Sequence, residues 1–380
     1  MISDTSECPA WIRELIRFTP LKNLIFVYGN TYDRVSYPVS TPNGTSVNWT
    51  ESELSTFFVR YLGSRGYEVI GLFDPVDGLT FAHPDMKKIY NNLHKSNSGT
   101  TASPSATSDG RIQEVPRGAT GANASPDKED QETDQPHQAG NRDPIKAIEG
   151  IRAAMTNTVV PCAFVFNLAS RLTASPTLLE EKEKDFFSRM LKASLTAKSV
   201  VRQDTVLNNV IILVCEKLND LPAFLYISNP RARSIHLPKP DTRARARFIE
   251  RSYKAFYTKP NTPDIELTPE LTGYFAALTE GLTNYEMSSL VNLSRIEKEP
   301  LQNIRKICER YKYGITESEW DKIGKDRLAM AEDKIRERVK GQDAAVHTVL
   351  DTIKRARTGL AAGGHGKAGR PRGVLFFAGP

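Results

Sequence analysis

The chain has 380 residues and a formal net charge of +6; 39% of its residues are hydrophobic and 25% are charged. These values are ordinary for a soluble globular protein, and the length leaves room for two or three domains. The sequence has no run of 18 apolar residues, and its N-terminus has neither the basic head nor the apolar stretch of a signal peptide. We therefore expect a cytoplasmic protein without a membrane span.

Short apolar runs alternate with helical patterns over the first 240 residues. Helices are predicted over 51–62, 145–155 and 178–195, where large apolar residues recur at helical spacing. Strands are predicted, in chain order, over 24–28, 67–73, 159–166, 210–214 and 234–237. Continuous apolar strands that alternate with helices indicate a parallel sheet covered on both faces, so the predicted fold class is α/β.

Residues 95–143 interrupt this pattern with Ser, Thr, Gly, Pro, Asp and Gln, and Ile112 and Val115 are almost their only large apolar residues. Such a segment cannot bury enough surface to offset the entropy lost on ordering, so we expect it to be disordered. Structured patterns resume on both sides of it. We therefore interpret it as an insertion within one domain, made of residues 1–94 and 144–295.

The sequence becomes wholly helical after the fifth predicted strand. Residues 241–295 are predicted to form a helical lid of the first domain, with Asp241 as the N-cap of an Arg-rich helix. Residues 296–338 are predicted to be a charged helical connector. A second unit is predicted over 339–380, with a helix capped by Asp343. One face of that helix carries Val346, Val349, Leu350, Ile353 and Leu360.

Residues 374–377 have the pattern of a buried strand, and Gly379 and Pro380 follow them. A short apolar strand closed by glycine is how a phosphate-binding loop begins, because a Gly-rich turn and the next helix N-terminus hold the anion. The Gly-Lys-[Ser/Thr] that completes such a loop is not in the sequence, and an apolar strand without a neighbour has an unpaired edge. We therefore expect the chain to be the front part of a longer protein, cut within this loop.

Several motifs follow one another in residues 339–380. They are Val-Lys-Gly-Gln-Asp-Ala-Ala-Val, a helix ending in Ile-Lys-Arg-Ala-Arg-Thr-Gly-Leu, a Gly/Pro/Arg loop, and Gly-Val-Leu-Phe-Phe-Ala-Gly-Pro. This order strongly resembles the start of the second nucleotide-binding module of Clp-type AAA+ unfoldases, over about a ninth of the chain. The alternative, the start of any other α/β domain, explains the helix and the strand but not the Gly-Gln-Asp, Arg-Ala-Arg-x-Gly-Leu and Gly-Pro motifs.

The resemblance implies a site for ATP and Mg²⁺. In this family the Val-x-Gly-Gln segment lies along the adenine through its backbone, which corresponds here to Val339, Lys340, Gly341 and Gln342. A plain helix-entry turn is the alternative role for Gly341. The first two positions of the phosphate loop correspond to Gly379 and Pro380. The lysine, the Mg²⁺-binding hydroxyl and the acidic pair are expected beyond residue 380.

The strand and helix order of residues 24–295, with the segment from Ser228 to Asp241, also resembles an AAA+ core followed by its lid. The resemblance implies a P-loop NTPase-like fold for this first module, but the residues at its nucleotide-binding and catalytic positions depart from the family's pattern. Gly29-Asn30-Thr31-Tyr32-Asp33 follows the first strand without a Gly-Lys-Thr, Asn167-Leu168 replaces an acidic pair, and Cys215-Glu216 replaces a polar residue that positions water. Without these groups a triphosphate has no preorganised partner, so we predict a degenerate, non-hydrolysing module.

Arg231 and Arg233 lie near the position from which AAA+ proteins project an arginine into a neighbouring subunit's nucleotide. They are therefore candidate inter-subunit arginines, and a surface pair near a lid hinge is the alternative. Asp33 and Asp74 are acidic residues close to strand ends, but spacing alone identifies no partner base or nucleophile for them. We predict no catalytic residue within the 380 residues.

The protein's own residues predict no metal site. No metal-ligand spacing relates five of the six histidines to one another or to cysteine; these five are His83, His94, His137, His236 and His347. The four cysteines are far apart and lack a C-x-x-C, which is typical of buried reduced thiols. The arginines after Asp241 spread over more than one helix face, as on a solvated surface, so nucleic-acid binding is not expected.

These resemblances imply an ATP-binding AAA+ ATPase that acts as a Clp-like chaperone. A ring of identical subunits would couple ATP hydrolysis in the second module to unfolding or remodelling of a protein substrate. Two alternatives stay open. One is an AAA+ ATPase that acts on nucleic acid or on a signalling assembly, and the other is a non-enzymatic scaffold in which both modules have lost catalysis.

Overall fold

The computed structural model describes residues 8–40, 47–98, 142–202, 205–260, 266–314, 330–358 and 375–376. The chain divides into two compact units, Met1–Lys239 and Pro240–Pro380, and each is described by itself. The grouping of residues 1–94 and 144–295 into one domain with a lid, and the start of a second module at residue 339, stay predictions. Within the described residues, no helix is long and apolar enough to cross a membrane.

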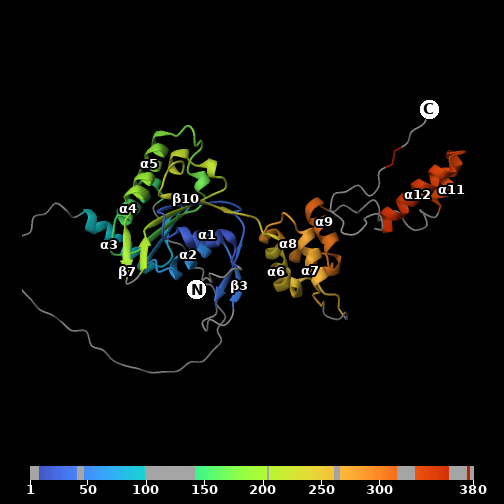
Figure 1. The fold of residues 1–380 in the computed structure, drawn as a ribbon, viewed down its shortest axis with the longest axis horizontal. Helices are drawn as coiled ribbons and strands as arrows, with labels where there is room; N and C mark the ends of the chain where they lie inside the picture. Colours follow the sequence, from blue (N-terminus) through green and yellow to red (C-terminus); the bar gives the residue numbers. More distant parts are fainter. Residues whose placement is uncertain are drawn as a thin grey trace, which may run out of the picture. The chain divides into compact units, whose positions relative to one another are not determined.

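A six-stranded sheet with the strand order β10-β1-β9-β6-β4-β5 forms the centre of the first unit (Figure 1). The strands are β1 (Leu24–Gly29), β4 (Val69–Asp74), β5 (Gly78–Phe81), β6 (Cys162–Phe166), β9 (Val210–Cys215) and β10 (Ala232–Leu237). Neighbouring strands are parallel except for β4 and β5. All five predicted strands are therefore present, and the predicted α/β class is confirmed.

Helices cover both faces of this sheet (Figure 1). On one face lie α1 (Ala10–Phe18) and α2 (Leu54–Ser64), and on the other α3 (Pro84–Ser98), α4 (Pro144–Met155) and α5 (Glu181–Thr196). Successive β1 residues alternate between the two cores, since Phe26 packs on the side of α4 and α5 and Val27 on the side of α1 and α2. Both are fully buried. This two-sided burial requires the continuous apolar runs seen in the sequence.

Two antiparallel hairpins were not predicted. β2 (Val35–Ser40) pairs with β3 (Val47–Ser52), and β7 (Ser199–Arg202) pairs with β8 (Thr205–Asn208). The helix predicted over 51–62 begins only at Leu54, because Glu51 and Ser52 belong to the ladder with β2. The prediction also omitted β5, α1 and α3.

Two predicted elements begin later than expected for local reasons. The strand predicted from residue 159 begins at Cys162, because the side chain of Asn157 accepts hydrogen bonds from the amides of Val159 and Val160 and holds them in a turn. The helix predicted from residue 178 begins at Glu181, where Glu180 and Glu183 form a capping box.

The predicted insertion lies between α3 and α4. Residues 95–98 are the last residues of α3, and Asp143 is the N-cap of α4, with its Oδ1 accepting from the amide of Ile145 at 3.0 Å. The predicted disorder is thus wrong for residues 95–98, which belong to α3, and for Asp143, which caps α4. Residues 99–141 lie outside the described residues, and their disorder stays a prediction.

Short 3₁₀ helices occur in the connections of both units. They are η1 (Ala169–Arg171), η2 (Leu218–Asp220), η3 (Ala223–Leu225), η4 (Tyr253–Ala255) and η5 (Leu301–Asn303). The four cysteines are buried and none forms a disulfide, as predicted. Burial raises the pKa of the Cys162 and Cys215 thiols to about 12, so both stay protonated and weakly nucleophilic at neutral pH.

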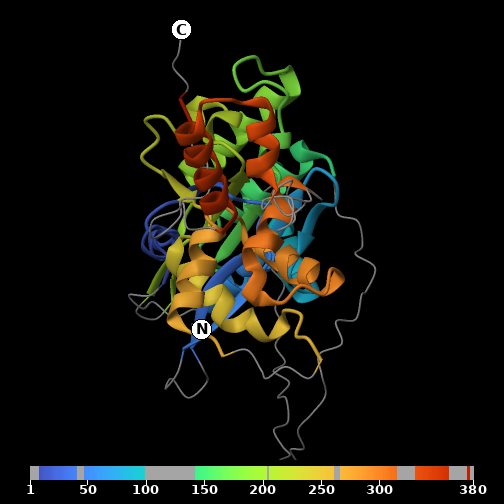
Figure 2. The same cartoon turned by 90° about the vertical axis from the view of Figure 1, so that its right-hand side faces the viewer.

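The second unit contains helices coloured yellow to orange in Figure 2. They pack around an apolar core that includes Phe248, Phe275 and Leu290. They are α6 (Thr242–Ser252), α7 (Pro269–Leu278), α8 (Asn284–Ile296) and α9 (Ile304–Tyr313). Asp241 caps α6 as predicted, since its Oδ1 accepts from the amide of Ala244 at 2.7 Å. Arg245, however, is not a surface residue. It is 7% exposed, because its guanidinium donates to the Ala276 carbonyl near the C-terminus of α7.

Two further helices follow, α11 (Ala331–Arg338) and α12 (Asp343–Thr358). Asp343 is the first residue of α12 and not the predicted cap before it. Val346 and Leu350 on its predicted apolar face are buried, and Leu360 lies outside the described residues. Leu375 and Phe376 are 42% and 91% exposed and belong to no strand, contrary to the buried strand predicted there, because no described strand pairs with them.

Candidate functional site

The carboxyl ends of the parallel strands meet at one edge of the sheet, here called the carboxyl edge; the opposite edge is the amino edge. The chain leaves β1 towards α2 on one face. It leaves β9 towards η2 and η3, where Leu221 and Leu225 pack on the other face. In open α/β sheets, ligands bind where the connections from adjacent strands diverge in this way. The loops after β1 and β9 therefore form the candidate site.

The loop after β1 uses its backbone donors within the chain. The amide of Gly29 donates to the Glu216 carbonyl at 3.1 Å, that of Asn30 to the Leu237 carbonyl at 2.9 Å, and that of Thr31 to the Gly29 carbonyl at 2.9 Å. Gly29 has a φ of +116°, and a Cβ there would lie 2.5 Å from the carbonyl oxygen of Leu237. Glycine is therefore required by a tight turn whose amides already have acceptors.

Asp33 is a buried carboxylate in the same loop. It is 5% exposed, and its oxygens accept from the Asn30 side-chain amide and from the backbone amide of Arg34, each at 2.8 Å. It therefore shapes the turn after β1 and brings a negative charge to it. Asp74, at the end of β4, likewise accepts from the amides of Val76 and Asp77 and forms a turn.

Glu216 lies at the centre of a polar cluster that the sequence did not predict. One oxygen of its carboxylate accepts from the Tyr32 hydroxyl and from the Arg171 guanidinium, both at 2.6 Å. The Glu216 amide donates to the hydroxyl of Ser170 at 2.8 Å, and that hydroxyl donates to Asp220 at 2.8 Å. The bond to Glu216, followed by partial burial, raises the pKa of Tyr32. The cluster joins the loops that follow β1, β6 and β9.

Asn167 and Leu168 follow β6, where the family's pattern has an acidic pair. The amide of Asn167 donates to the Phe73 carbonyl at 2.8 Å, and Leu168 has a φ of 53° and leads into η1. These residues end the strand and turn the chain towards Ser170 and Arg171. Their side chains offer no carboxylate to a cation or to a water molecule.

Val339 to Gln342 form the turn between α11 and α12. Gly341 has a φ of +70°, and a Cβ there would meet no atom within 4 Å. The Gln342 carbonyl accepts from the amide of Val346 at 3.0 Å, inside the first turn of α12. This backbone fits a helix-entry turn, and the contact of Val339, Lys340, Gly341 and Gln342 with adenine stays a prediction. Gly379 and Pro380 lie outside the described residues.

Arg231 and Arg233 lie at the amino end of β10, away from the carboxyl edge. Arg231 donates from its guanidinium to the Asn23 side chain at 2.9 Å. The guanidinium of Arg233 lies over the ring of Phe18, 4.1 Å from its centroid, and pairs with Glu14. Both side chains thus have partners in their own chain, and an inter-subunit role stays a prediction.

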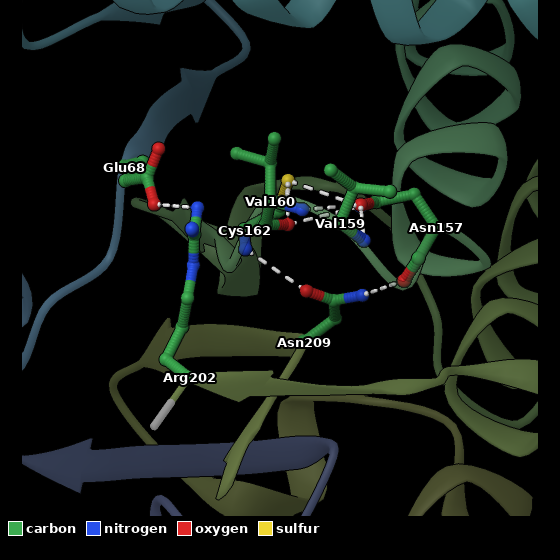
Figure 3. Close-up of polar contacts among 7 residues, drawn as sticks. All are labelled: Glu68, Asn157, Val159, Val160, Cys162, Arg202 and Asn209. Atoms are coloured by element: carbon green, nitrogen blue, oxygen red, sulfur yellow. Dashed lines mark hydrogen bonds and ion pairs between the residues drawn. The ribbon is translucent and has the colours of Figure 1, made fainter. Parts of the chain in front are cut away.

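A network of side-chain amides holds the amino edge together (Figure 3). Asn209 is fully buried, and its side chain accepts from the Cys162 amide at 2.9 Å and donates to the carbonyls of Met155 and Asn157 at 3.0 and 2.9 Å. Asn157 in turn accepts from Val159 and Val160. Beside this network, Arg202 pairs with Glu68. Each polar group of Asn209 has a partner, so we assign this network a structural role.

The residues of the carboxyl edge do not fit ATP and Mg²⁺. The loop after β1 has no lysine, the amides of Gly29, Asn30 and Thr31 have acceptors, and the carboxylates of Asp33 and Glu216 bond to residues of this loop and would repel a phosphate bound to it. Among the described residues, no group of three or more His, Cys, Asp and Glu side chains could hold a metal ion.

A protein-family model matches most of the first unit. The family model described as "AAA+ chaperone, N-terminal Rossmann-like domain" matches residues 3–238. "Putative chaperone protein ClpB2, chloroplastic" of Arabidopsis thaliana is 33% identical over 108 residues, which are 28% of this chain and 16% of that protein. The chain thus matches only a small part of this curated relative.

Among solved structures, a chain of the HORMA:CdnC:Trip13 complex of E. coli MS115-1 has a TM-score of 0.37 and 9% identity, over 78% of this chain and 77% of that one. A likeness this weak carries no argument. The family model, in contrast, covers more than half of the 380 residues. The chain therefore belongs to the AAA+ chaperone family and contains its N-terminal Rossmann-like domain.

Proposed function

We propose that the chain is part of an AAA+ ATPase chaperone in which the Rossmann-like domain neither binds nor hydrolyses ATP. The observation that carries this proposal is that the amides of Gly29, Asn30 and Thr31 all donate to carbonyl oxygens of the chain itself. An active phosphate loop presents such amides to phosphate oxygens. Here phosphate would have to displace three hydrogen bonds before it gained any.

Electrostatic repulsion also opposes the binding of a triphosphate at this loop. Two like unit charges about 4 Å apart repel each other by about 4 kcal/mol at the effective dielectric constant of a protein surface. The Asp33 carboxylate is buried beside Asn30, and the Glu216 carboxylate is bonded to Tyr32. A triphosphate at the end of β1 would approach both. Hydrolysis would meet a separate obstacle, because Asn167 and Leu168 supply no carboxylate for Mg²⁺ or for the attacking water.

The proposed site for ATP and Mg²⁺ is the second module. Support comes from membership of an AAA+ chaperone family and from the partial similarity to a ClpB-type chaperone. Further support comes from the order in which the motifs follow one another in the sequence from Val339 onwards. In this proposal Val339 to Gln342 form one wall of the adenine site and Gly379 and Pro380 begin the phosphate loop. In this proposal the ligands of Mg²⁺ are not among the 380 residues, so these residues alone are expected to have no ATPase activity.

The work proposed for the complete protein is unfolding or remodelling of protein substrates. Copies of the chain would assemble into a ring in the cytoplasm, and hydrolysis in the second module would drive the substrate through it. Arg231 and Arg233 stay candidates for contacts between subunits. They would first have to leave Asn23 and Glu14.

Titration of a fluorescent ATP analogue against the full-length parent tests the assignment of the two modules. Asn30→Trp should leave the dissociation constant within about twofold, because no phosphate is expected there. Gly341→Trp should weaken binding at least about tenfold, a loss of about 1.4 kcal/mol, because the side chain would occupy the space of the base.

A matched control is needed because Gly341 has a positive φ, where any larger residue strains the turn. Asparagine tolerates this backbone conformation, so Gly341→Asn separates turn strain from bulk and should bind more tightly than Gly341→Trp. If Asn30→Trp abolishes binding while Gly341→Trp does not, the active and silent modules are the reverse of those proposed.

A further inference from the structure

The polar cluster at the carboxyl edge joins three loops through a single residue, Glu216. Its carboxylate accepts from Tyr32 in the loop after β1 and from Arg171 in the loop after β6, each at 2.6 Å. The backbone of Glu216 also forms hydrogen bonds with the chain at the end of β1 and with the loop after β6. The Glu216 carbonyl accepts from the Gly29 amide at 3.1 Å, and its amide donates to the Ser170 hydroxyl at 2.8 Å.

The donors gathered around Glu216 are the kinds of group that bind phosphate in other proteins. A backbone amide, a hydroxyl and a guanidinium all donate readily to an anionic oxygen. Here the amide of Gly29, the hydroxyl of Tyr32 and the guanidinium of Arg171 donate to oxygens of one residue of the protein itself. Glu216 thus supplies internally what a nucleotide would supply to an active module.

We propose that Glu216 is an internal substitute for the nucleotide, which fixes the loops after β1, β6 and β9 in one arrangement whether or not ATP is present. The inference rests on the proposed function in that it takes the Rossmann-like domain to be free of nucleotide. It adds a mechanical role: the domain keeps these loops in one conformation throughout the protein's ATP cycle.

An ordinary surface ion pair would not have this effect. The Arg171 side chain is 64% exposed, and exposed pairs contribute about 0.2–1 kcal/mol. Two features distinguish Glu216. Its side chain is only 33% exposed, and one of its two carboxylate oxygens accepts hydrogen bonds from donors in two different loops. Loss of its charge should therefore loosen both loops together, although each lies far from Glu216 in the sequence.

Hydrogen exchange of the 380-residue chain, followed by mass spectrometry at pH 7, tests this linkage. Glu216→Gln should raise exchange about fivefold in peptides that cover 29–34 and in those that cover 168–172, which corresponds to about 1 kcal/mol. Tyr32→Phe should affect only the first loop, and Arg171→Gln only the second. Glu68→Gln is the matched control, because it breaks a Glu–Arg ion pair at the amino edge and should change neither loop (Figure 3).

The same measurement with and without Mg²⁺-ATP separates this inference from the proposed function. Neither loop of the wild-type chain should change when ATP is added. If ATP protects 29–34 in the wild type, the domain binds nucleotide and the proposed function is wrong. If ATP has no effect but Glu216→Gln leaves either loop at its wild-type exchange rate, the domain is silent and Glu216 is not the internal substitute.

Discussion

At the amino edge of the sheet, Asn209 is fully buried and bonds to three backbone groups, whereas at the carboxyl edge Tyr32, Arg171 and Glu216 meet partly in solvent. The first set of groups is neutral, whereas the second contains the ion pair of Arg171 and Glu216. Burying a neutral amide with every bond satisfied costs little, while burying an ion costs several kcal/mol even when it is paired. The amino edge can therefore be part of the core, and the carboxyl edge is held by contacts that water weakens.

The largest effect expected from this comparison is that of Asn209→Ala. The substitution leaves the amide of Cys162 and the carbonyl of Asn157 without their partner inside the protein. Each orphaned group costs about 1–3 kcal/mol, so we expect a loss of about 3 kcal/mol and a fall in Tm of about 6–12 °C. Thermal denaturation followed by circular dichroism measures this loss.

Asn219→Ala is the control at the carboxyl edge, where the exposed Asn219 side chain accepts from the Tyr226 hydroxyl at 3.4 Å. Its Tm should change by no more than about 2 °C. Equal losses in the two variants would show that the two edges do not differ in the way described.

A smaller loss is expected for Gly29→Ala. Its Cβ would meet the Leu237 carbonyl oxygen at 2.5 Å, and its φ of +116° is unfavourable for alanine. We expect a loss of about 2 kcal/mol in the free energy of unfolding. Gly63→Ala, in α2 of the same unit, has only an ordinary contact with Ile70 at 3.9 Å and should gain about 0.5 kcal/mol, as is usual for this change within a helix. Urea denaturation of both variants compares them, and opposite signs are required.

The smallest expected effect concerns pH. The Tyr32 hydroxyl donates to Glu216, which raises its pKa above the value of 10.0 found in an unfolded chain. The bond therefore contributes fully below pH 10 and is lost as pH rises through the raised pKa. Wild type should melt slightly above Tyr32→Phe at pH 8, and this difference should disappear at alkaline pH. The amides of Asn209 do not titrate, so the difference between wild type and Asn209→Ala should persist in the same series.

The sequence predicted the central strands because each is buried on both faces. The runs from Leu24 to Tyr28 and from Val210 to Val214 are short, continuously apolar and alternate with helical patterns, which is typical of strands in a covered parallel sheet. The hairpins gave no comparable signal. β7 and β8 have four residues each, and their outward-facing Val201 and Val206 are 68% and 51% exposed, so apolar residues do not mark one face. Pro38 within β2 also argues against a strand, except in a short ribbon of this kind.

The candidate site was predictable in what it lacks but not in what it contains. The missing lysine and the residues Asn167 and Leu168 are visible in the sequence. The convergence of Tyr32, Arg171 and Glu216 is not, because it depends on the strand order, which brings together loops up to 184 positions apart. The cap at Asp241 was predicted from local sequence, whereas the burial of Arg245 depends on a carbonyl 31 positions away.

The strand order also bears on how the protein is made. The side chain of Asn23, just before β1, donates to the carbonyl of Asn209, just before β9, 186 positions later, and β10 is later still. Ribosomes add about 5–20 residues per second, so β1 waits about 10–40 s for either of its neighbours. During that interval β1, four of whose residues are buried in the folded sheet, has no partner on either side. The strand of this sheet that is synthesised first is thus among the last to be paired, and the nascent chain itself is exposed to aggregation until Leu237 has left the ribosome.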